Sequence, residues 1–187
     1  LALLTPRRRA TYAEFDAETD ALALALLEDG VQIGDRVGIW APNCAEGMIT
    51  QYATAKIGAI LVTINPSYRT HELEFALNQS GISVLVTAAA FKTSNYAEMV
   101  AEVAPRCTQL RKVVHIGEEF DALVDSGRDS AAHNRSLLEA IPLQADQPIN
   151  IQYTSGTTGF PKGATLSHHN ILNNGYFVGE ACGYTEN

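Results

Sequence analysis

The sequence predicts an α/β fold built on a doubly wound, mostly parallel sheet. Between residues 11 and 116, segments with helical periodicity alternate with short apolar segments. Residues 59–64 are apolar and β-branched almost throughout, which is typical of a strand covered on both faces. Alternation of this kind favours parallel strands with helices on both sides of the sheet.

Four helices are expected in this region, and their ends carry recognisable signals. Thr11 followed by Glu14 is a capping box at the start of the first helix, and Gly30 ends that helix. Thr70 caps the third helix and Gly81 terminates it. The expected helical ranges are 12–29, 45–57, 71–79 and 96–104.

Four strands alternate with these helices. The turn Gly34-Asp35 leads into the first strand, Pro42-Asn43 stops it, and Asn65-Pro66 stops the second. Because a helix separates each strand from the next, the strands should run in the same direction. The expected strands are residues 36–41, 59–64, 83–87 and 112–116.

The pattern weakens after this region. Residues 118–148 are rich in acidic, small and polar side chains, so we expect a surface excursion with one short helix at 136–140. The expected organisation is an α/β subdomain (1–117), this excursion (118–148) and a phosphate-loop hairpin with its following helix (149–187), which starts the next part of a large domain. Ser167 caps that helix. Residues 149–187 either join the first sheet or start another.

The stretch after Tyr153 carries the chemistry. Glycine lets the backbone approach an anion closely, hydroxyl groups add hydrogen-bond donors, and a single lysine adds a mobile positive charge. We therefore predict a site for a polyphosphate. Its expected residues are Thr154, Ser155, Gly156, Thr157, Thr158, Gly159 and Lys162.

This stretch differs from the standard P-loop. Lys162 precedes Gly163 instead of following a glycine, and residues 164–166 favour a strand where a P-loop would begin a helix. The loop should therefore join two strands as a hairpin. A flexible surface turn is the alternative interpretation of a stretch so rich in Gly, Ser and Thr.

The motif resembles the signature of the adenylate-forming superfamily, [YF]-T-S-G-[TS]-T-G-x-P-K-G-[VA] followed by a strand and [ST]-H-x-N. Every fixed position is matched in residues 153–164 and again in residues 167–170. The resemblance extends over nearly the whole chain, and it is greatest to fatty acyl-CoA synthetases of the medium-chain-like, family member 2 type. The other blocks that carry it are Tyr12-Ala13-Glu14-Phe15, Gly34-Asp35-Arg36-Val37, Ala55-Lys56-Ile57-Gly58-Ala59, Asn65-Pro66, Tyr68-Arg69 and His71-Glu72-Leu73.

The resemblance implies an N-terminal fragment of an ATP-dependent acid–thiol ligase. Such an enzyme activates a fatty acid as acyl-AMP and transfers the acyl group to CoA, with Mg²⁺ offsetting phosphate charge. In the family, the lysine at the position of Lys162 lies in the loop around the ATP phosphates. The family's later motifs are absent, so no catalytic residue is assigned here. We expect the fragment alone to be inactive and to self-associate through surface that the missing part would cover.

The histidines offer weaker signals. His168 matches a family histidine, but capping or packing is its favoured interpretation, and the same choice applies to Asn170. His71, His115 and His133 are isolated in the sequence, which favours structural or surface roles.

Composition narrows the remaining classes. A hydrophobic fraction of 46% excludes a disordered chain, and a net charge of −8 disfavours a nucleic-acid binder. Three widely spaced cysteines, without a CxxC pattern, predict free thiols, no metal site and a reducing, cytoplasmic location. No apolar run reaches the ~18–20 residues of a membrane span. An NTP hydrolase with a variant phosphate loop and a non-catalytic nucleotide- or partner-binding domain remain as alternatives.

Overall fold

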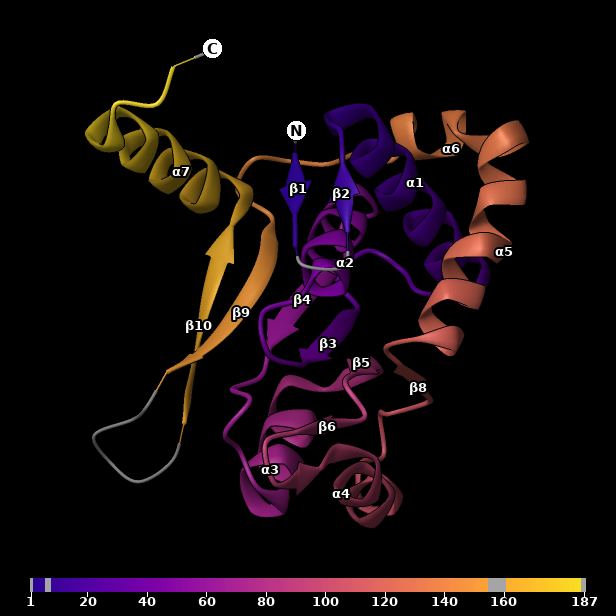
Figure 1. The fold of residues 1–187 in the computed structure, drawn as a ribbon, viewed down its shortest axis with the longest axis vertical. Helices are drawn as coiled ribbons and strands as arrows, with labels where there is room; N and C mark the ends of the chain where they lie inside the picture. Colours follow the sequence, from indigo (N-terminus) through magenta and orange to yellow (C-terminus); the bar gives the residue numbers. More distant parts are fainter. Residues whose placement is uncertain (1, 6–7, 155–160, 186–187) are drawn as a thin grey trace.

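A six-stranded sheet forms the centre of the protein in a computed structural model that describes residues 2–5, 8–154 and 161–185 (Figure 1). Its strand order is β10-β9-β4-β3-β5-β8, and all neighbours are parallel except β9 and β10. This arrangement confirms the mostly parallel α/β sheet. The strands are β3 (Arg36–Trp40), β4 (Ile60–Thr63), β5 (Ile82–Thr87), β8 (Lys112–His115), β9 (Pro148–Thr154) and β10 (Lys162–Ser167).

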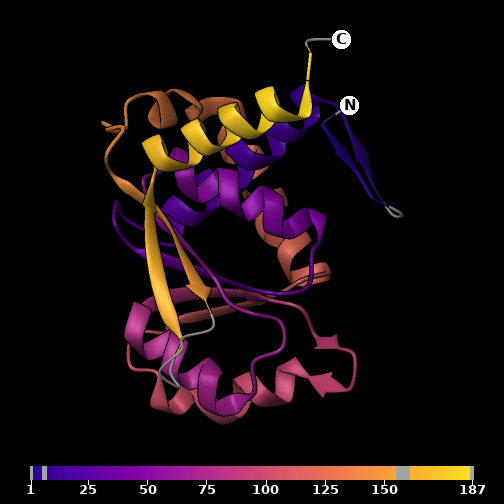
Figure 2. The same ribbon diagram turned by 90° about the vertical axis from the view of Figure 1, so that its left-hand side faces the viewer.

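Helices cover both faces of this sheet, as a doubly wound fold requires (Figure 2). One layer contains α1 (Tyr12–Glu28), α2 (Ala45–Lys56), α5 (Glu118–Asn134) and α6 (Ser136–Glu139). The other contains α3 (Thr70–Ser80), α4 (Tyr96–Val103) and the 3-10 turn η1 (Ala104–Arg106). Two small hairpins, β1 (Leu3–Leu4) with β2 (Arg9–Ala10) and β6 (Ala90–Phe91) with β7 (Ser94–Asn95), complete the described elements with α7 (His168–Cys182).

The end signals in the sequence place the helices within one residue of their observed bounds. The Thr11–Glu14 capping box forms, with the Glu14 backbone N–H donating to Thr11 Oγ1 at 3.2 Å. At α3 the expectation was wrong by one position: Thr70 is the first helical residue, and Arg69 occupies the N-cap. The bounds agree because helix ends depend on local contacts that neighbouring residues supply.

The core on the α3–α4 side is organised around one aromatic pair. Trp40 at the end of β3 stacks on Tyr96 of α4, with ring centroids 3.6 Å apart. The Trp40 indole donates to the Asn65 carbonyl at 3.1 Å, and the Tyr96 hydroxyl donates to the Pro66 carbonyl. Burial raises the pKa of Tyr96 to about 12, so its hydroxyl keeps its proton. These bonds tie the loop after β4 to the end of β3.

Residues 118–134 differ from the expected irregular excursion. Residues 118–134 form α5, which packs along α1 (Figure 1). Phe120, Leu123 and Val124 form the apolar stripe of α5 and are buried in the core beneath it. The expected short helix is present as α6, and β9 joins the first sheet beside β4. The division into three parts stays a prediction.

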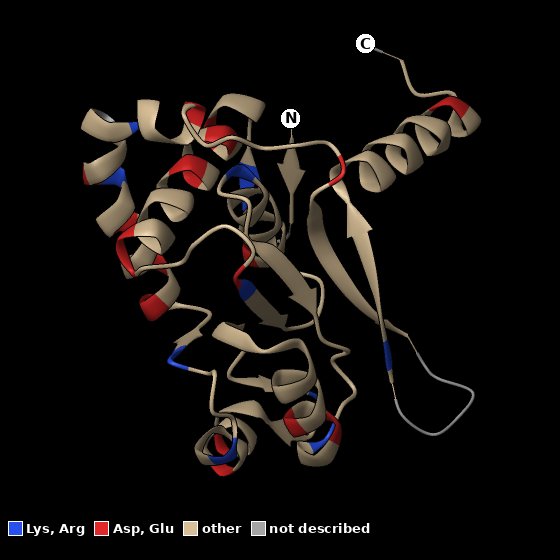
Figure 3. Cartoon of the chain, turned by 180° about the vertical axis from the view of Figure 1, so that it is seen from behind, with Lys and Arg blue, Asp and Glu red and all other residues tan. Residues whose placement is uncertain are grey.

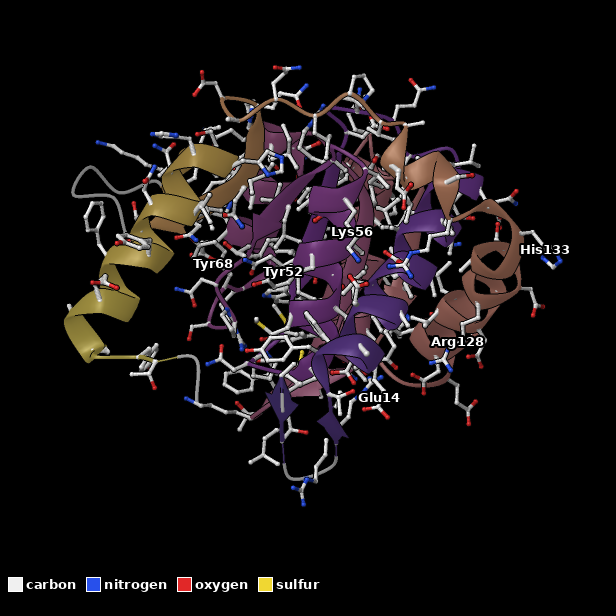
Figure 4. The ribbon with its side chains drawn as sticks, turned by 90° about the horizontal axis from the view of Figure 1, so that it is seen from above. Glu14, Tyr52, Lys56, Tyr68, Arg128 and His133 are labelled. Atoms are coloured by element: carbon white, nitrogen blue, oxygen red, sulfur yellow. The ribbon has the colours of Figure 1, made fainter. Side chains whose placement is uncertain are left out.

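A charged cluster ties α1 to its neighbours. The Lys56 ammonium of α2 lies 2.6 Å from the Asp16 carboxylate and 2.5 Å from the buried Asp20 carboxylate (Figure 4). Arg135, between α5 and α6, contacts the same two carboxylates at 2.7 and 2.9 Å. The hydrogen bond from Lys56 holds the pKa of Asp16 below its ordinary value.

This shift makes the contribution of Asp16 to stability depend on pH. A carboxylate with a lowered folded pKa stabilises the fold above its unfolded pKa and loses that effect as pH falls through the folded pKa. Asp16→Asn should therefore lower Tm by about 1–4 °C at pH 7, and the deficit should shrink as pH is lowered below about 4. Thermal scans of wild type, Asp16→Asn and the exposed control Asp146→Asn measure this; a deficit that is constant down to pH 3 contradicts it.

Two further expectations concern membrane-spanning helices and free cysteines. Across that part of the chain, every helix is too short or too polar to cross a bilayer. Cys44, Cys107 and Cys182 are free thiols, as the sequence predicts.

Candidate functional site

The described ends of the predicted phosphate segment, Thr154 and Lys162, lie where β9 ends and β10 begins in a β-hairpin. β9 runs parallel to β4, with Leu61 opposite Asn150 and Thr63 opposite Gln152, and β10 returns antiparallel to β9. This pairing confirms the hairpin that the strand-like run at residues 164–166 indicated. Because β9 runs parallel to β4, it ends at the carboxyl edge of the sheet, where ligands of doubly wound folds bind.

Two of the predicted phosphate-binding residues lie within the described part of the chain and face each other. Lys162 pairs with Thr154 across the hairpin, and Thr154 Oγ1 donates to the Lys162 carbonyl at 3.4 Å. Directly opposite residues project from the same face of an antiparallel pair, and both side chains are exposed. Their ammonium and hydroxyl groups can therefore approach one anion. The other predicted residues, Ser155, Gly156, Thr157, Thr158 and Gly159, lie outside the described residues.

Lys162 is an isolated positive charge in this region. Charged residues are frequent on α1, α5, α3 and α4, whereas the hairpin and α7 contain few (Figure 3). Lys162 is the only Lys or Arg between residues 148 and 185. Within this region, Lys162 is therefore the cation available to an anion bound between the end of β9 and the start of β10.

The opposite face of the hairpin rests on α3. Tyr153 is partly buried against the core cluster on that side. Its hydroxyl donates to Gln79 Oε1 at 2.9 Å and lies 3.4 Å from the Ala76 carbonyl oxygen. Burial raises the pKa of Tyr153, so the hydroxyl remains a donor at neutral pH. The sequence marked Tyr153 only as a motif position, because nothing local indicates that α3 lies beside it.

The start of α7 explains two other candidate residues. Asn170 and Ser167 form a capping box, in which the Asn170 backbone N–H donates to Ser167 Oγ at 3.3 Å and Asn170 Oδ1 accepts from the Ser167 N–H at 2.9 Å. His168 is the first residue of the helix, and burial lowers its pKa, which favours a neutral ring. These contacts support capping and packing as the roles of Asn170 and His168.

The three isolated histidines are not brought to the hairpin as a group. His115 lies on β8, at the opposite edge of the sheet, with Nδ1 3.0 Å from Glu119 Oε2. His133 points outward from α5 (Figure 4), and His71 lies in α3. Within the described residues, no three His, Cys, Asp or Glu side chains gather as a metal site would require.

Two hollows that the sequence did not indicate lie at the carboxyl ends of the strands. One, of about 270 Å³, lies between α2 and the ends of β3 and β4, and Met48, Gln51 and Thr63 are among its lining residues. The other, of about 450 Å³, lies between the loops after β3, β5 and β8 and the β1–β2 hairpin. Both depend on how loops from distant positions meet, which is why local sequence patterns do not reveal them.

Comparison with known proteins identifies the family. The model of the family described as AMP-binding enzyme matches residues 1–186. The chain belongs to the AMP-binding enzyme family. Among curated relatives, the medium-chain acyl-CoA ligase ACSF2, mitochondrial, of Danio rerio is 40% identical over 94% of this chain and 32% of that protein. The Homo sapiens protein of the same name is 37% identical over 96% of this chain and 32% of that protein.

Solved structures in the family share the fold. A long-chain-fatty-acid-CoA ligase (FadD1) of Archaeoglobus fulgidus has a TM-score of 0.77 and 27% identity, covering 97% of this chain and 36% of that one. The anthranilate CoA ligase AuaEII, solved with anthranoyl-AMP, has a TM-score of 0.77 and 26% identity, covering 89% of this chain and 31% of that one. The chain therefore spans about a third of the length of these family members.

Proposed function

We propose that this chain is the phosphate-binding N-terminal part of an AMP-forming fatty acyl-CoA ligase. In the proposed reaction a fatty-acid carboxylate attacks the α-phosphorus of ATP, which gives acyl-AMP and releases pyrophosphate. The thiol of CoA then attacks the acyl carbon and releases AMP. The observation that carries the proposal is that Lys162 and Thr154 lie directly opposite each other where β9 ends and β10 begins. Both residues belong to a motif that is matched at every fixed position.

Lys162 has the largest role in this proposal. Its ammonium would offset the negative charge that builds up on the phosphates as the carboxylate attacks. Thr154 and the hydroxyls of Ser155, Thr157 and Thr158 would donate hydrogen bonds to phosphate oxygens.

The donor set of the hairpin fits an anion. Residues 148–170 contain no Asp or Glu, so no carboxylate competes with phosphate there. The proposed Mg²⁺ would be held by the ATP phosphates and by oxygen ligands outside these residues.

The decisive experiment is exchange of labelled pyrophosphate into ATP by the full-length protein, with a panel of fatty and aromatic acids. Exchange that requires an acid supports acyl-AMP formation, and the best acid identifies the substrate class. Phosphate release without exchange would instead favour the NTP hydrolase. ATP binding without either reaction would favour the non-catalytic domain. For the 187-residue chain alone we expect no exchange, because it spans about a third of its relatives.

The proposed location is a reducing compartment, and the cytoplasm is the one the free thiols favour. Vertebrate relatives are named mitochondrial proteins. Fractionation of cells that express the full-length protein separates these two locations.

We also propose that the isolated chain self-associates through α7. Within the described part of the chain, this helix has no buried residue, and Leu172, Tyr176 and Phe177 are 75%, 61% and 66% exposed. A helix whose apolar side chains stay exposed gains little stabilisation from packing. α7 contains few charged residues (Figure 3). Two copies could therefore meet at α7 without bringing like charges together, despite the net charge of −8.

Phe177→Glu should make the chain monomeric by adding a charge to this surface. Tyr12→Glu is the matched control, because Tyr12 is 74% exposed and begins α1, outside this surface. Light scattering after gel filtration, over a concentration series, should show a concentration-dependent dimer for wild type and Tyr12→Glu only. A monomeric wild type at every concentration contradicts the proposal.

A further inference from the structure

We propose that Tyr153 is a positioning residue. Together with Gln79 and Gly163, it holds against α3 the end of the β9–β10 hairpin at which Thr154 and Lys162 lie, and so sets the position of these two residues. The proposal rests on the proposed function insofar as Thr154 and Lys162 bind phosphate. Its structural part concerns only how the end of the hairpin is held, and that part can be tested without ATP.

The hairpin extends beyond the strand that supports it. The ladder between β4 and β9 ends where Thr63 pairs with Gln152, so Tyr153 and Thr154 continue past the last pairing with β4. On its other side β9 pairs with β10, which is the edge strand of the sheet. Beyond Gln152, main-chain pairing therefore joins the two hairpin strands to each other and no longer to the rest of the sheet. Side-chain contacts have to set the direction in which this end points.

Tyr153 makes such a contact to a well-anchored helix. Its hydroxyl donates to Gln79 Oε1 at 2.9 Å and lies 3.4 Å from the Ala76 carbonyl, both on α3. α3 is held in the core by Leu73 and Leu77, which are 0% and 1% exposed. A rigid element therefore supports the hairpin at the residue next to Thr154.

Gly163 leaves space on the hairpin face that carries Ile151 and Tyr153. It lies directly opposite Tyr153 in the antiparallel ladder, so a side chain there would project from the same face as the Tyr153 ring. A Cβ on Gly163 would lie 2.9 Å from Cγ2 of Ile151 and 3.6 Å from the Tyr153 ring. Because the first distance is shorter than real contacts of a Cβ, a larger residue at 163 would displace the Ile151 side chain or the strand beside Tyr153.

The alternation of side chains then separates anchoring from binding. Neighbouring residues of a strand point to opposite faces, so Tyr153 and the space at Gly163 face α3, while Thr154 and Lys162 face away from it. A change at Tyr153 can therefore alter the position of Thr154 and Lys162 without removing any group that would touch phosphate.

Two substitutions test the anchor with little disturbance of packing. Tyr153→Phe keeps the ring and removes the hydroxyl, and the family signature accepts Phe here, so this variant measures what the hydroxyl adds in this chain. Gln79→Met removes the nearer acceptor at similar size and leaves the Ala76 carbonyl in place. If the two groups act as a pair, the double variant should behave like either single one. Tyr96→Phe is the matched control, because it removes a hydroxyl from the same core cluster that bonds to the Pro66 carbonyl instead.

The first readout is hydrogen exchange of the 187-residue chain. Tyr153→Phe and Gln79→Met should each accelerate exchange by about three- to tenfold, the equivalent of one hydrogen bond, at those amides among residues 153, 154, 162 and 163 that bond between β9 and β10. Exchange in β4 should stay unchanged, and Tyr96→Phe should not affect the hairpin. Unchanged exchange at the hairpin in both variants overturns the proposal, whether or not the protein uses ATP.

The second readout is acid-dependent pyrophosphate exchange by the full-length protein. Both variants should lower kcat/KM for ATP by about two- to tenfold, the effect of one hydrogen bond, while KM for the acid and Tm stay close to wild type. A loss that instead follows Tm across all variants, including Tyr96→Phe, would assign Tyr153 a purely structural role and overturn the functional part. A wild-type protein without any exchange activity would refute the proposed function, and the amide measurement would still decide the anchor.

Discussion

Lys162→Ala in the full-length protein is expected to lower acid-dependent pyrophosphate exchange by about 10²–10³-fold, the range found when one preorganised donor to a transition state is removed. The structure explains why the loss should be large. Lys162 is exposed on the same face as Thr154, and no other Lys or Arg occurs between residues 148 and 185 to replace its charge. The effect should fall on kcat more than on KM for the acid, because the charge on phosphate grows toward the transition state.

The matched control is Lys112→Ala. Lys112 begins β8, at the opposite edge of the sheet, where it pairs with Asp29. Its loss should leave exchange within about twofold of wild type, since a surface ion pair contributes little. Equal activity of Lys162→Ala and Lys112→Ala would mean that Lys162 is a surface lysine and that the segment is the flexible turn considered above.

The largest expected effect on stability comes from Gly127→Ala, at the contact of α5 with α1. A Cβ at this position would lie 1.9 Å from the Ala21 carbonyl oxygen and 2.7 Å from its carbon. These are backbone atoms, so relief requires the two helices to move apart and to loosen Phe120, Leu123 and Val124 in the core. We expect a loss of about 3 kcal/mol in the free energy of unfolding, at the upper end of overpacking effects, and a Tm lower by about 6–12 °C.

Gly175→Ala provides the control for the same chemical change in a helix. Nothing lies within 4 Å of a Cβ at Gly175 in α7. This variant should be neutral or more stable by up to about 1 kcal/mol, because alanine favours helix over glycine. Denaturant unfolding of both variants measures the difference; equal stability would show that α1 and α5 are not packed as closely as described.

Sequence reasoning succeeded where structure depends on neighbouring residues. The pairs Thr11–Glu14 and Ser167–Asn170 close capping boxes within a single turn, so the starts of α1 and α7 were readable. The hairpin followed from the short strand-forming run after Lys162, and its geometry places Lys162 opposite Thr154. Local propensity and local hydrogen bonds determine each of these features.

Sequence reasoning failed where a distant surface decides the outcome. α5 is mostly polar, and its few apolar residues form a narrow stripe. This stripe stabilises the helix only when it packs against α1, which a local sequence pattern does not show. The contact from Tyr153 to Gln79 spans 74 positions, and no property of either residue predicts the other. The placement of β9 was undetermined for the same reason, since β4 accepts a neighbour without specifying which later strand supplies it.

The placement of β9 beside β4 has a consequence for synthesis on the ribosome. The outer edge of β4 pairs with β9, and Asn150, which pairs with Leu61, is synthesised 89 residues after Leu61 (150 − 61). At the usual pace of translation the apolar edge of Ile60–Thr63 stays open for about 4–18 s, and an open apolar edge invites pairing with another nascent chain. Neighbouring ribosomes on one messenger RNA therefore carry several nascent chains with an unpaired β4 edge at the same time. The yield of soluble protein should then depend on chaperones and on the speed of translation through codons 64–150.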